Sequence, residues 1–291
     1  MKILDKKILA QTPDTRITKI EVEAPLVAKK VQPGQFILLM VTEEGERVPL
    51  TVVGNDPQCE SITLIFQEVG YSTKLLGTKA VGDELYALVG PLGHATPIKK
   101  YGKILAVGGG GGIAEILPVV KALKEAGNVV YSILGARTKE LLILKDEIQS
   151  YSDKLYLTTD DGSLGQKGFV SDVLGKILKE DKDFKLVYCV GPVPMMKVVS
   201  GVTKPYNIKT TVCLNAIMLD ATGMCGGCRL IEGEKVKFCC VDGPEFDGHL
   251  VDFDELMQRQ KRFVDEEKQA LQKLNSHECK LNKTIDKAKR K

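Results

Sequence analysis

The sequence predicts an antiparallel β-barrel followed by a parallel α/β domain, a small cysteine-rich region and a C-terminal helix. The chain has 291 residues, which is enough for about two domains. Short strands punctuated by Gly, Pro, Asn and Asp fill residues 1–100, whereas strands alternate with helices in residues 101–205. Cysteine and glycine are concentrated in residues 206–255, and a basic, polar stretch occupies residues 256–291. Hydrophobic residues make up 43% of the chain, so it can bury a full core.

Composition and charge exclude several classes of protein. The net charge is +3, and the surplus lies in residues 258–291, which hold 11 Lys and Arg against 5 Asp and Glu. This distribution argues against a nucleic-acid-binding face. No apolar run approaches the roughly 18 residues of a membrane span, and the N-terminus lacks the pattern of a signal peptide. We therefore expect a cytoplasmic protein whose 8 cysteines are thiols or ligands rather than disulfides.

Residues 1–100 are expected to form the barrel. Strands are predicted over residues 17–23, 36–41, 51–53, 61–66 and 84–89. Turn-forming residues separate these strands, as is typical of antiparallel barrels and sandwiches. One short helix is predicted near residues 72–76.

The alternation of strands and helices begins at Gly102. Strands are predicted over residues 103–107, 129–134, 155–159 and 185–190, and helices over 114–126, 141–150 and 170–179. Such alternation is typical of parallel βαβ units, so a separate α/β domain is expected over residues 101–205.

The last part of the chain lacks clear periodicity until Asp254 and then favours helix. A broken heptad stripe runs through the tail at Val264, Leu271, Leu274, Leu281 and Ile285. The stripe fits a helix packed on its own chain and also a helix that docks on a partner, and the sequence leaves both open.

Five consecutive glycines stand between the first strand and the first helix of the α/β domain. Gly109, Gly111 and Ala114 fit the G-x-G-x-x-A pattern, which lets the backbone approach a pyrophosphate at a helix N-terminus. The predicted nucleotide contacts in this loop are Gly109, Gly110, Gly111, Gly112 and Ile113. A tight turn without a ligand is the alternative, and the strand–loop–helix context favours the nucleotide.

The rest of the nucleotide site is less defined by the sequence. No acidic residue follows at the position, about 20 residues on, that would bind the ribose 2′-hydroxyl. The second strand instead leads to Arg137, which suits an adenine face or a 2′-phosphate, so NAD and NADP both remain open. Asp161, Gly191 and Pro192 follow later strands, and loops at the carboxyl ends of parallel strands line the ligand crevice.

The cysteine region has the spacing of an iron–sulfur site with one ligand exchanged. Plant-type ligation uses C-x4-C-x2-C followed by a distant cysteine. Here Asp220 occupies the first position, and Cys225, Cys228 and Cys240 follow. A carboxylate is a harder ligand than a thiolate, so we expect a shifted cluster potential. A zinc site built from the same cysteines is the alternative, as is the absence of a metal. The isolated cysteines are expected to be ordinary thiols: Cys59, Cys189, Cys213 and Cys279.

Two barrel segments carry groups suited to a phosphorylated heteroaromatic ligand. One comprises Arg47, Pro49, Leu50 and Thr51, and the other comprises Gly70, Ser72 and Thr73. The first offers a guanidinium to a phosphate and a hydroxyl to a ring nitrogen, and the second offers a helix N-terminus as a phosphate cradle. A surface arginine and a simple helix cap are the alternatives, and the position ahead of a nucleotide domain favours binding.

These blocks, in this order, resemble the ferredoxin–NADP reductase-like flavoproteins. RVPLT (47–51) and VGYST (69–73) are similar to the flavin motifs of that family, and GGGGGIAEILP (108–118) and VGPVPMM (190–196) to its nicotinamide domain. The cysteine region resembles the electron-transfer subunits of dihydroorotate dehydrogenase and their relatives. Those subunits carry four cysteines, whereas LDATGMCGGCRL (219–230) and CVDGPEFDGH (240–249) carry the aspartate-plus-three-cysteine set of the NADH-dependent reduced ferredoxin:NADP+ oxidoreductase branch.

The resemblance implies roles for particular residues. FAD would lie against the barrel, with Arg47 near its phosphates and Thr51, the expected catalytic residue, near flavin N5. Residues 109–113 would contact the pyrophosphate of NAD(H), and Met195 belongs to the last motif of that site. One [2Fe-2S] cluster would be held by Asp220, Cys225, Cys228 and Cys240. Many members of the family have Cys directly before the final Gly-Pro; here that residue is Val190, so Cys189 receives no catalytic role.

The resemblance also implies a function. A flavin exchanges both hydride and single electrons, so it must stand between nicotinamide and the cluster. The chain would then be an electron-transfer subunit of an electron-bifurcating transhydrogenase, with a larger flavin and iron–sulfur subunit as partner and ferredoxin reached through that partner. The alternatives are the electron-transfer subunit of an NAD-dependent dihydroorotate dehydrogenase and a zinc-stabilised, non-redox nucleotide-binding module.

Overall fold

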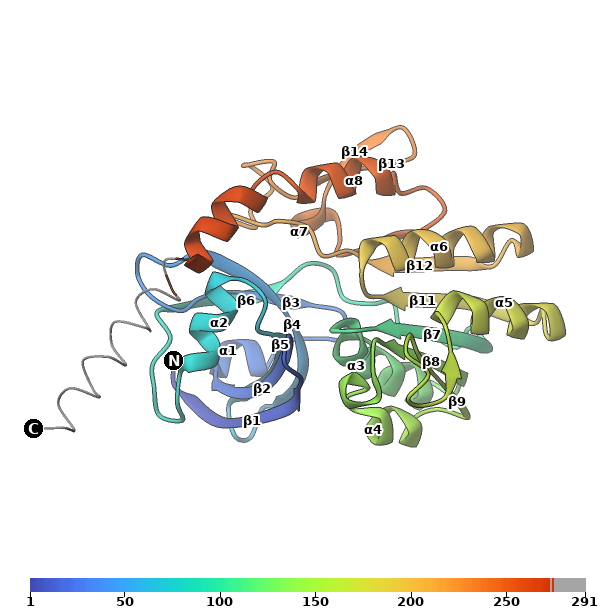
Figure 1. Cartoon of the computed structure of the whole chain (residues 1–291), viewed down its shortest axis with the longest axis horizontal. Coiled ribbons are helices and arrows are strands. Elements are labelled where there is room, and N and C mark those ends of the chain that lie inside the picture. The colour runs from blue at the N-terminus through green and yellow to red at the C-terminus, as the bar shows by residue number, and fades with distance from the viewer. Residues whose placement is uncertain (273, 275–291) are drawn as a thin grey trace, which may run out of the picture.

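Figure 1 shows the computed structural model of the chain, which describes residues 1–272 and 274. A curled antiparallel sheet from the N-terminal third lies beside an α/β unit, shown in green and yellow. The cysteine-rich region and α8 (Phe253–Gln260) run along the top of both. The barrel-plus-α/β fold class expected from the sequence is confirmed.

The N-terminal unit is a six-stranded antiparallel sheet in the order β1-β2-β5-β4-β3-β6. Its elements are β1 (Ile3–Gln11), β2 (Arg16–Glu23), α1 (Pro25–Ala28), β3 (Phe36–Met40), β4 (Arg47–Asp56), β5 (Ser61–Gln67), α2 (Tyr71–Thr78) and β6 (Ala87–Leu92). Alternate residues such as Ile20 and Val22 are fully buried inside the curl. Backbone bonds from Ile3 N to Asp83 O (3.0 Å) and from Leu85 N to Met1 O (2.9 Å) join β1 to the segment before β6. These bonds bring the two edges of the sheet together, so the unit is barrel-like.

The second unit is a seven-stranded, mostly parallel sheet in the order β10-β9-β8-β7-β11-β12-β15. Its strands are β7 (Lys103–Gly109), β8 (Val129–Ala136), β9 (Lys154–Thr159), β10 (Gln166–Lys167), β11 (Phe184–Val190), β12 (Lys209–Cys213) and the antiparallel edge strand β15 (Glu245–Asp247). The order reverses direction between β7 and β11. This reversal is the switch point at which open α/β sheets bind ligands, outside the carboxyl ends of the strands.

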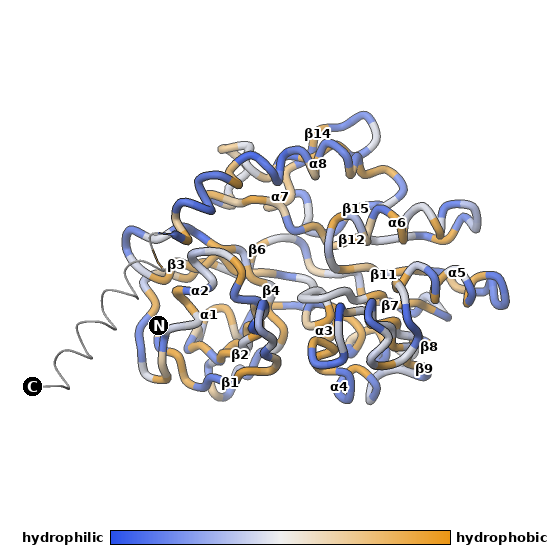
Figure 2. The backbone as a smooth tube through the Cα atoms, in the orientation of Figure 1, coloured by the Kyte–Doolittle hydropathy of each residue, from blue (hydrophilic) through white to orange (hydrophobic). Residues whose placement is uncertain are grey.

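Helices cover both faces of this sheet. One face packs on α3 (Gly112–Glu125) and α4 (Lys145–Ser150), and the other on α5 (Val170–Glu180) and α6 (Val193–Thr203). Two short 3-10 turns, η1 (Lys139–Leu141) and η2 (Lys204–Tyr206), complete the connections. Because both faces are buried, the central strands are apolar at nearly every position. Figure 2 shows this hydrophobic character along the strands and the hydrophilic character of α8.

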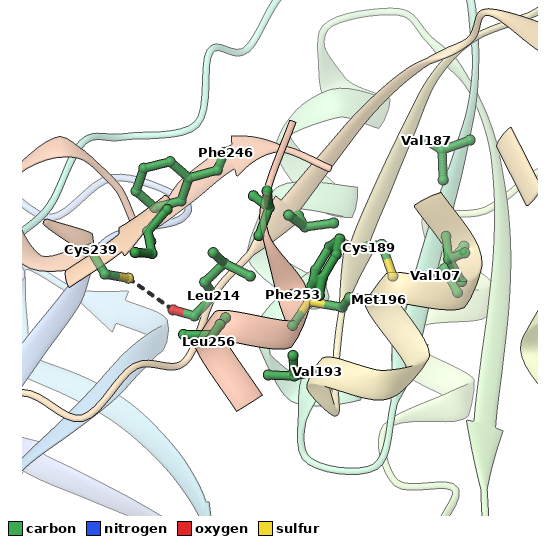
Figure 3. Packing of buried hydrophobic residues seen from close by; sticks show 14 of the residues in the cluster. Val107, Val187, Cys189, Val193, Met196, Leu214, Cys239, Phe246, Phe253 and Leu256 are labelled. Atoms are coloured by element: carbon green, nitrogen blue, oxygen red, sulfur yellow. Dashed lines mark hydrogen bonds between the residues drawn. The ribbon is translucent and has the colours of Figure 1, made fainter. Parts of the chain in front are cut away.

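The cysteine-rich region shares its core with the α/β unit. It contains the hairpin β13 (Arg229–Glu232) and β14 (Lys235–Phe238), α7 (Cys239–Asp242), β15 and α8. The shared core, drawn in Figure 3, includes Leu214, Cys239, Phe246, Phe253 and Leu256 packed with Val193 and Met196 of α6. The Cys239 Sγ donates a hydrogen bond to the Leu214 carbonyl at 3.2 Å. This continuous apolar packing fixes the region against the sheet.

Several observed elements differ from those predicted. β1 and α1 were not predicted, β4 extends through the expected turn at Gly54, and β6 begins three residues later than expected. The helix predicted over 141–150 divides into η1 and α4, because Leu144 adopts φ 54° and the apolar residues before it turn into the core. β12 through β15 lie where no periodicity was found. In β12 the buried Thr210 interrupts the apolar pattern, and its hydroxyl donates to Thr203 Oγ1 at 2.6 Å.

The part of the tail that the structure describes is helical over residues 264–272. Val264, Leu271 and Leu274 of the predicted stripe are half-buried, whereas Leu281, Ile285 and Cys279 lie outside the described residues. None of the helices in the described part of the chain combines the length and the apolar character that spanning a membrane requires.

Candidate functional site

A cavity of about 570 Å³ opens where the barrel-like unit meets the switch point of the α/β sheet. Its walls come from β4, the start of α2, the glycine loop, the turn after β11 and the segment after β12. Cavities of this size suit a cofactor. The predicted residues that line it are Pro49, Leu50, Thr51, Gly70, Ser72, Thr73, Gly109, Gly111, Gly112, Gly191 and Pro192. The fold therefore brings the barrel motifs and the nucleotide motifs to one place.

The barrel wall supplies a hydroxyl and a helix N-terminus. Thr51, on β4, donates from Oγ1 to Glu115 Oε2 at 3.1 Å. At the start of α2, Thr73 Oγ1 accepts hydrogen bonds from the backbone N–H groups of Val69 and Gly70, both at 3.1 Å, which fixes the turn. The first N–H groups of any helix lack intrahelical partners, so this turn suits an anionic group such as a phosphate.

The opposite wall is the glycine loop at the start of α3. A Cβ on Gly112 would lie 2.8 Å from Gly191 N and still closer to the carbonyl of Val190. Only glycine allows α3 to approach the end of β11 this closely. Gly110 adopts φ +56°, in the left-handed region that glycine favours. The N-terminus of α3 is thereby placed at the cavity wall, where its N–H groups and dipole suit a pyrophosphate.

Three predicted nucleotide residues lie behind this wall rather than on it. Gly110 forms the turn, and Ile113 is fully buried in the core. Met195 packs on the two loops: a Cβ on Gly109 would lie 3.0 Å from its Cε, and a Cβ on Gly191 would lie 2.6 Å from it. Met195 thus holds the glycine loop against the turn after β11. Direct cofactor contacts from these residues stay predictions.

Arg47 connects the barrel to the cysteine region. Its Nη1 donates to the carbonyl of Leu219 at 3.0 Å, directly before Asp220. Arg47 is absent from the cavity lining, so its contact with a flavin phosphate stays a prediction.

Arg137 and Asp161 also lie outside the cavity lining. Arg137 Nη2 donates to Thr15 Oγ1 at 2.5 Å, which ties the end of β8 to the turn between β1 and β2. Asp161 Oδ1 accepts from the Ser163 hydroxyl at 2.7 Å and from its N–H at 2.9 Å, and these bonds lower the pKa of Asp161. The nucleotide roles of both residues stay predictions.

The four predicted cluster ligands come together as two pairs. Cys228 Sγ accepts from the Cys240 N–H at 3.4 Å, and the Asp220 carboxylate interacts with Cys225. The pKa of Asp220 is lowered chiefly by the backbone N–H of Thr222 and less by Cys225. Within residues 1–272 and 274, no three acidic, cysteine or histidine side chains close on one point as a metal site. The ligand set therefore stays a prediction.

The surroundings of these pairs suit a cluster of iron and sulfide. Cys225 Sγ accepts from the Gly227 N–H at 3.4 Å. Gly223 and Gly226 adopt φ +79° and +69°, so the backbone can turn its N–H groups inward around the sulfurs. Hydrogen bonds to sulfur stabilise the negative charge of an iron–sulfur cluster. Cys228 is buried and Cys225 is exposed, so such a cluster would lie near the surface.

Two side chains of α8 hold the cysteine loop (residues 215–228 and 239–241) from outside, and no sequence pattern indicated either of them. Arg259 Nη2 donates to the carbonyl of Gly226 at 3.0 Å, and Gln260 Nε2 donates to that of Asn215 at 2.7 Å. The Arg259 side chain is only 11% exposed and lies 3.6 Å from the Glu255 carboxylate. α8 is therefore part of the candidate cluster site.

Two titratable residues at the cavity were also missed from sequence. Glu115 lines the cavity, and burial raises its pKa while the Thr51 hydroxyl opposes that shift. Cys213, predicted to be an ordinary thiol, lines the cavity as well, and burial raises its pKa, with Glu115 and Glu245 adding to the effect. A carboxylate directly after G-x-G-x-x-A, in an otherwise apolar helix start, was the available indication for Glu115.

The chain matches two known domain families. Residues 106–201 match the oxidoreductase NAD-binding domain. Residues 215–252 match the iron–sulfur cluster binding domain of dihydroorotate dehydrogenase B, a span that includes all four predicted ligands.

Two relatives and one solved structure are similar to this chain over most of its length. A "dihydroorotate dehydrogenase B (NAD(+)), electron transfer subunit homolog" of Thermotoga maritima is 46% identical over 85% of this chain and 87% of its own length. An "uncharacterized protein in adh 3′ region" of Clostridium beijerinckii is 44% identical over 92% of both chains. The solved structure of an NADH-dependent reduced ferredoxin-NADP oxidoreductase aligns with a TM-score of 0.88 at 42% identity, covering 94% of this chain and 97% of that one. A ferredoxin-NADP+ reductase of Plasmodium falciparum, at a TM-score of 0.57 and 15% identity over 70% of this chain and 88% of that one, shares the fold alone.

The fold and the site define an oxidoreductase of the ferredoxin–NADP reductase type that carries an iron–sulfur domain. The chain belongs to the family of dihydroorotate dehydrogenase B electron transfer subunits and their homologues. The family resemblance, the oxidoreductase class and the NAD-binding and iron–sulfur domains expected from the sequence are confirmed.

Proposed function

We propose that this chain is the flavin and iron–sulfur electron-transfer subunit of an electron-bifurcating transhydrogenase. It exchanges hydride between NAD(H) and FAD, and single electrons between FAD and a [2Fe-2S] cluster. The observation that carries this proposal is the cavity at the switch point, which both nucleotide-type motifs line. Arg47, on the barrel strand β4 that supplies one wall of the cavity, joins that strand to the cysteine loop. The solved relative with a TM-score of 0.88 is described as a flavin-based electron-bifurcating enzyme, which supports the proposal.

The bound groups supply complementary redox chemistry: nicotinamide carries hydride, the cluster carries single electrons, and the flavin exchanges both. The chain's own contribution is to bind and orient them. The start of α2 and the start of α3 each offer helix N–H groups to phosphates across the cavity. Thr51 would offer its hydroxyl to the ring nitrogen N5 of the flavin. Met195 keeps the two loops of the α/β wall together.

The cysteine loop would hold the cluster through Asp220, Cys225, Cys228 and Cys240. The N–H groups of Gly227 and Cys240 would offset negative charge on the cluster sulfurs, and the harder oxygen ligand from Asp220 would set the cluster apart from all-cysteine clusters. The bond from Arg47 to Leu219 keeps the loop next to the barrel strand that carries Thr51.

The cysteine loop also presents an apolar surface for a larger partner subunit. Met224 is 87% exposed, Leu219 50% and Val241 41%. A Cβ on Gly223 would lie 2.9 Å from Val241, and one on Gly227 would lie 3.5 Å from Leu219, so both side chains lie against the glycine-containing turn that carries Met224. Exposed apolar patches of this kind mark protein interfaces. A partner seated here would exchange single electrons with the cluster over a short distance.

The test is the cofactor content of the full chain, expressed and purified anaerobically. FAD, iron and acid-labile sulfide are expected, and a colourless protein that holds only zinc would overturn the proposal. Cys225→Ser is expected to lose iron and keep FAD, while Cys59→Ser, at an exposed cysteine outside the loop, should keep both.

The identity of the partner subunit distinguishes an electron-bifurcating transhydrogenase from a dihydroorotate dehydrogenase. Co-expression with the gene product encoded next to this chain should give a complex whose flavins are reduced by NADPH. Reduction of that complex by dihydroorotate instead would assign the chain to a dihydroorotate dehydrogenase, the activity named for several of its relatives.

A further inference from the structure

The peptide unit that joins Gly226 to Gly227 is hydrogen-bonded at both of its ends. Its N–H, on Gly227, donates to Cys225 Sγ at 3.4 Å. Its carbonyl, on Gly226, accepts from Arg259 Nη2 at 3.0 Å and from the Arg229 N–H at 3.3 Å. A guanidinium of α8 and a sulfur of the predicted ligand set are therefore connected through a single peptide unit.

The backbone at Gly226 sets the direction of this peptide unit. Gly226 adopts φ +69°, in the left-handed region that residues other than glycine rarely adopt. The carbonyl can thus face α8 while the N–H of Gly227 faces the Cys225 sulfur. Because the Arg229 N–H also holds the carbonyl, the peptide unit can keep this direction without the Arg259 side chain.

The packing of α8 holds Arg259 in place. Phe253 and Leu256 are buried in the core that α8 shares with α6. Gln260 Nε2 fastens the end of the helix to the carbonyl of Asn215 at 2.7 Å. The Arg259 side chain is largely buried, so solvent and salt screen its charge less than that of a surface arginine.

The hydrogen bond of this guanidinium goes to the Gly226 carbonyl rather than to the nearby carboxylate of Glu255. Arg259 Nη1 lies 3.6 Å from Glu255 Oε1, which is longer than a hydrogen bond. Among the described residues, Glu255 Oε2 and Arg259 Nε are buried without a hydrogen-bond partner. Hydrogen bonds with a charged donor are about twice as strong as neutral ones, so the bond to Gly226 is a strong one.

We propose that Arg259 is a positioning residue that raises the reduction potential of the cluster through the Gly226–Gly227 peptide unit. This inference rests on the proposed function, which places the cluster at Cys225. Linked hydrogen bonds polarise one another, so a charged donor on the carbonyl makes the Gly227 N–H a stronger donor to the sulfur. Reduction adds one electron to the cluster and forms no bond. A stronger donor stabilises that added negative charge and favours the reduced form.

Glu255 opposes this effect. Its carboxylate lies one helical turn before Arg259 and offsets part of the positive charge of the guanidinium. Removal of the guanidinium should therefore lower the potential, whereas removal of the carboxylate charge should raise it. Two neighbouring residues of α8 are thus expected to shift the potential in opposite directions.

The test is an anaerobic redox titration of the full holoprotein, in which electron paramagnetic resonance follows the reduced cluster. Arg259→Met should lower the equilibrium constant for cluster reduction about tenfold, which is about 59 mV for one electron. Arg259→Lys keeps a charged donor and should recover most of that shift. Glu255→Gln should raise the constant about threefold, the scale of a partly exposed ion pair. Arg262→Met, which removes an exposed arginine nearby, should leave the potential unchanged.

The hydrogen bond to sulfur has a spectroscopic readout of its own. Electron–nuclear double resonance of the reduced cluster, before and after exchange into D2O, measures the coupling of the exchangeable N–H proton. This coupling should weaken in Arg259→Met and stay unchanged in Arg262→Met. A lowered potential with unchanged coupling would mean that the charge acts directly through space, and it would overturn the route through the peptide unit.

The outcomes separate this inference from the proposed function. A wild type without iron and sulfide would refute the proposed function itself. If the wild type holds the cluster and Arg259→Met has the same potential, or Arg262→Met shifts it equally, the inference is wrong. If Arg259→Met fails to hold a cluster, Glu255→Gln decides: a raised potential supports the inference, and an unchanged one overturns it. Thermal unfolding and iron content establish that equally folded and loaded proteins are compared.

Discussion

Because α3 lies so close to the end of β11, we predict that Gly112→Ala destabilises the protein. The added Cβ would lie 2.8 Å from Gly191 N and closer to the carbonyl of Val190. Both neighbours are backbone atoms of a packed strand and its turn, so neither can swing aside as the end of a side chain would. We expect the substitution to lower the free energy of unfolding by about 1–3 kcal/mol, the range for overpacking.

Gly111→Ala is the matched control. Gly111 has a helical φ of −59°, and no heavy atom lies within 4 Å of the position of its Cβ. Replacing glycine by alanine where the backbone is already compatible stabilises a protein by about 0.4–1 kcal/mol, because the unfolded chain loses freedom. Two adjacent alanine substitutions are therefore expected to act in opposite directions, with a gap of about 1.5–4 kcal/mol between them.

Equilibrium unfolding in urea measures that gap. The midpoints of the two variants should fall on opposite sides of the wild type, with the slope unchanged if the unfolded state is the same. A Gly112→Ala variant as stable as Gly111→Ala would show that α3 does not approach β11 as described.

Three further substitutions test the site. Thr51→Ala should slow flavin reduction by NADH about tenfold, the scale of one lost hydrogen bond, with little loss of FAD and with rescue by Thr51→Ser; equal losses of rate and FAD would make its role structural. Asp220→Cys should keep the cluster and move its reduction potential, and an unchanged potential would remove Asp220 from the ligand set. Arg259→Met should speed the loss of iron to a chelator about fivefold, because the carbonyl of Gly226 loses its charged donor. Arg262→Met, at an exposed arginine, should leave that rate unchanged, and equal rates in the two variants would contradict the role of α8.

The sequence predicted best the elements whose packing is uniform along their length. β7, β8 and β11 are buried on both faces, so their apolar runs were unambiguous. β1 is an edge strand with most of its side chains exposed, and its sequence ILDKKILAQ carries no clean alternation. β12 escaped prediction because a buried threonine stands where an apolar residue was expected.

The same distinction explains which site residues were predictable. The cavity walls follow from local motifs, because glycine loops and helix starts carry their chemistry within a few residues. Glu115, Cys213 and Arg259 act through partners far away in the chain, such as Thr51 across 64 positions and Gly226 across 33. Only tertiary packing reveals such pairs. Arg47 shows the converse. Its motif predicted a flavin phosphate as its partner, whereas the partner observed in the structure is a loop carbonyl 172 positions away.

In the proposed function, electrons that arrive in pairs from NADH leave this chain singly through the cysteine loop. Anaerobic titration of the purified chain with NADH, followed by electron paramagnetic resonance, examines this claim in one experiment. We expect the flavin absorbance to bleach and the spectrum of a reduced [2Fe-2S] cluster to grow in the same titration, with Cys225→Ser retaining only the bleaching. Complete flavin bleaching without any cluster spectrum, in protein shown to contain iron and sulfide, would contradict the claim.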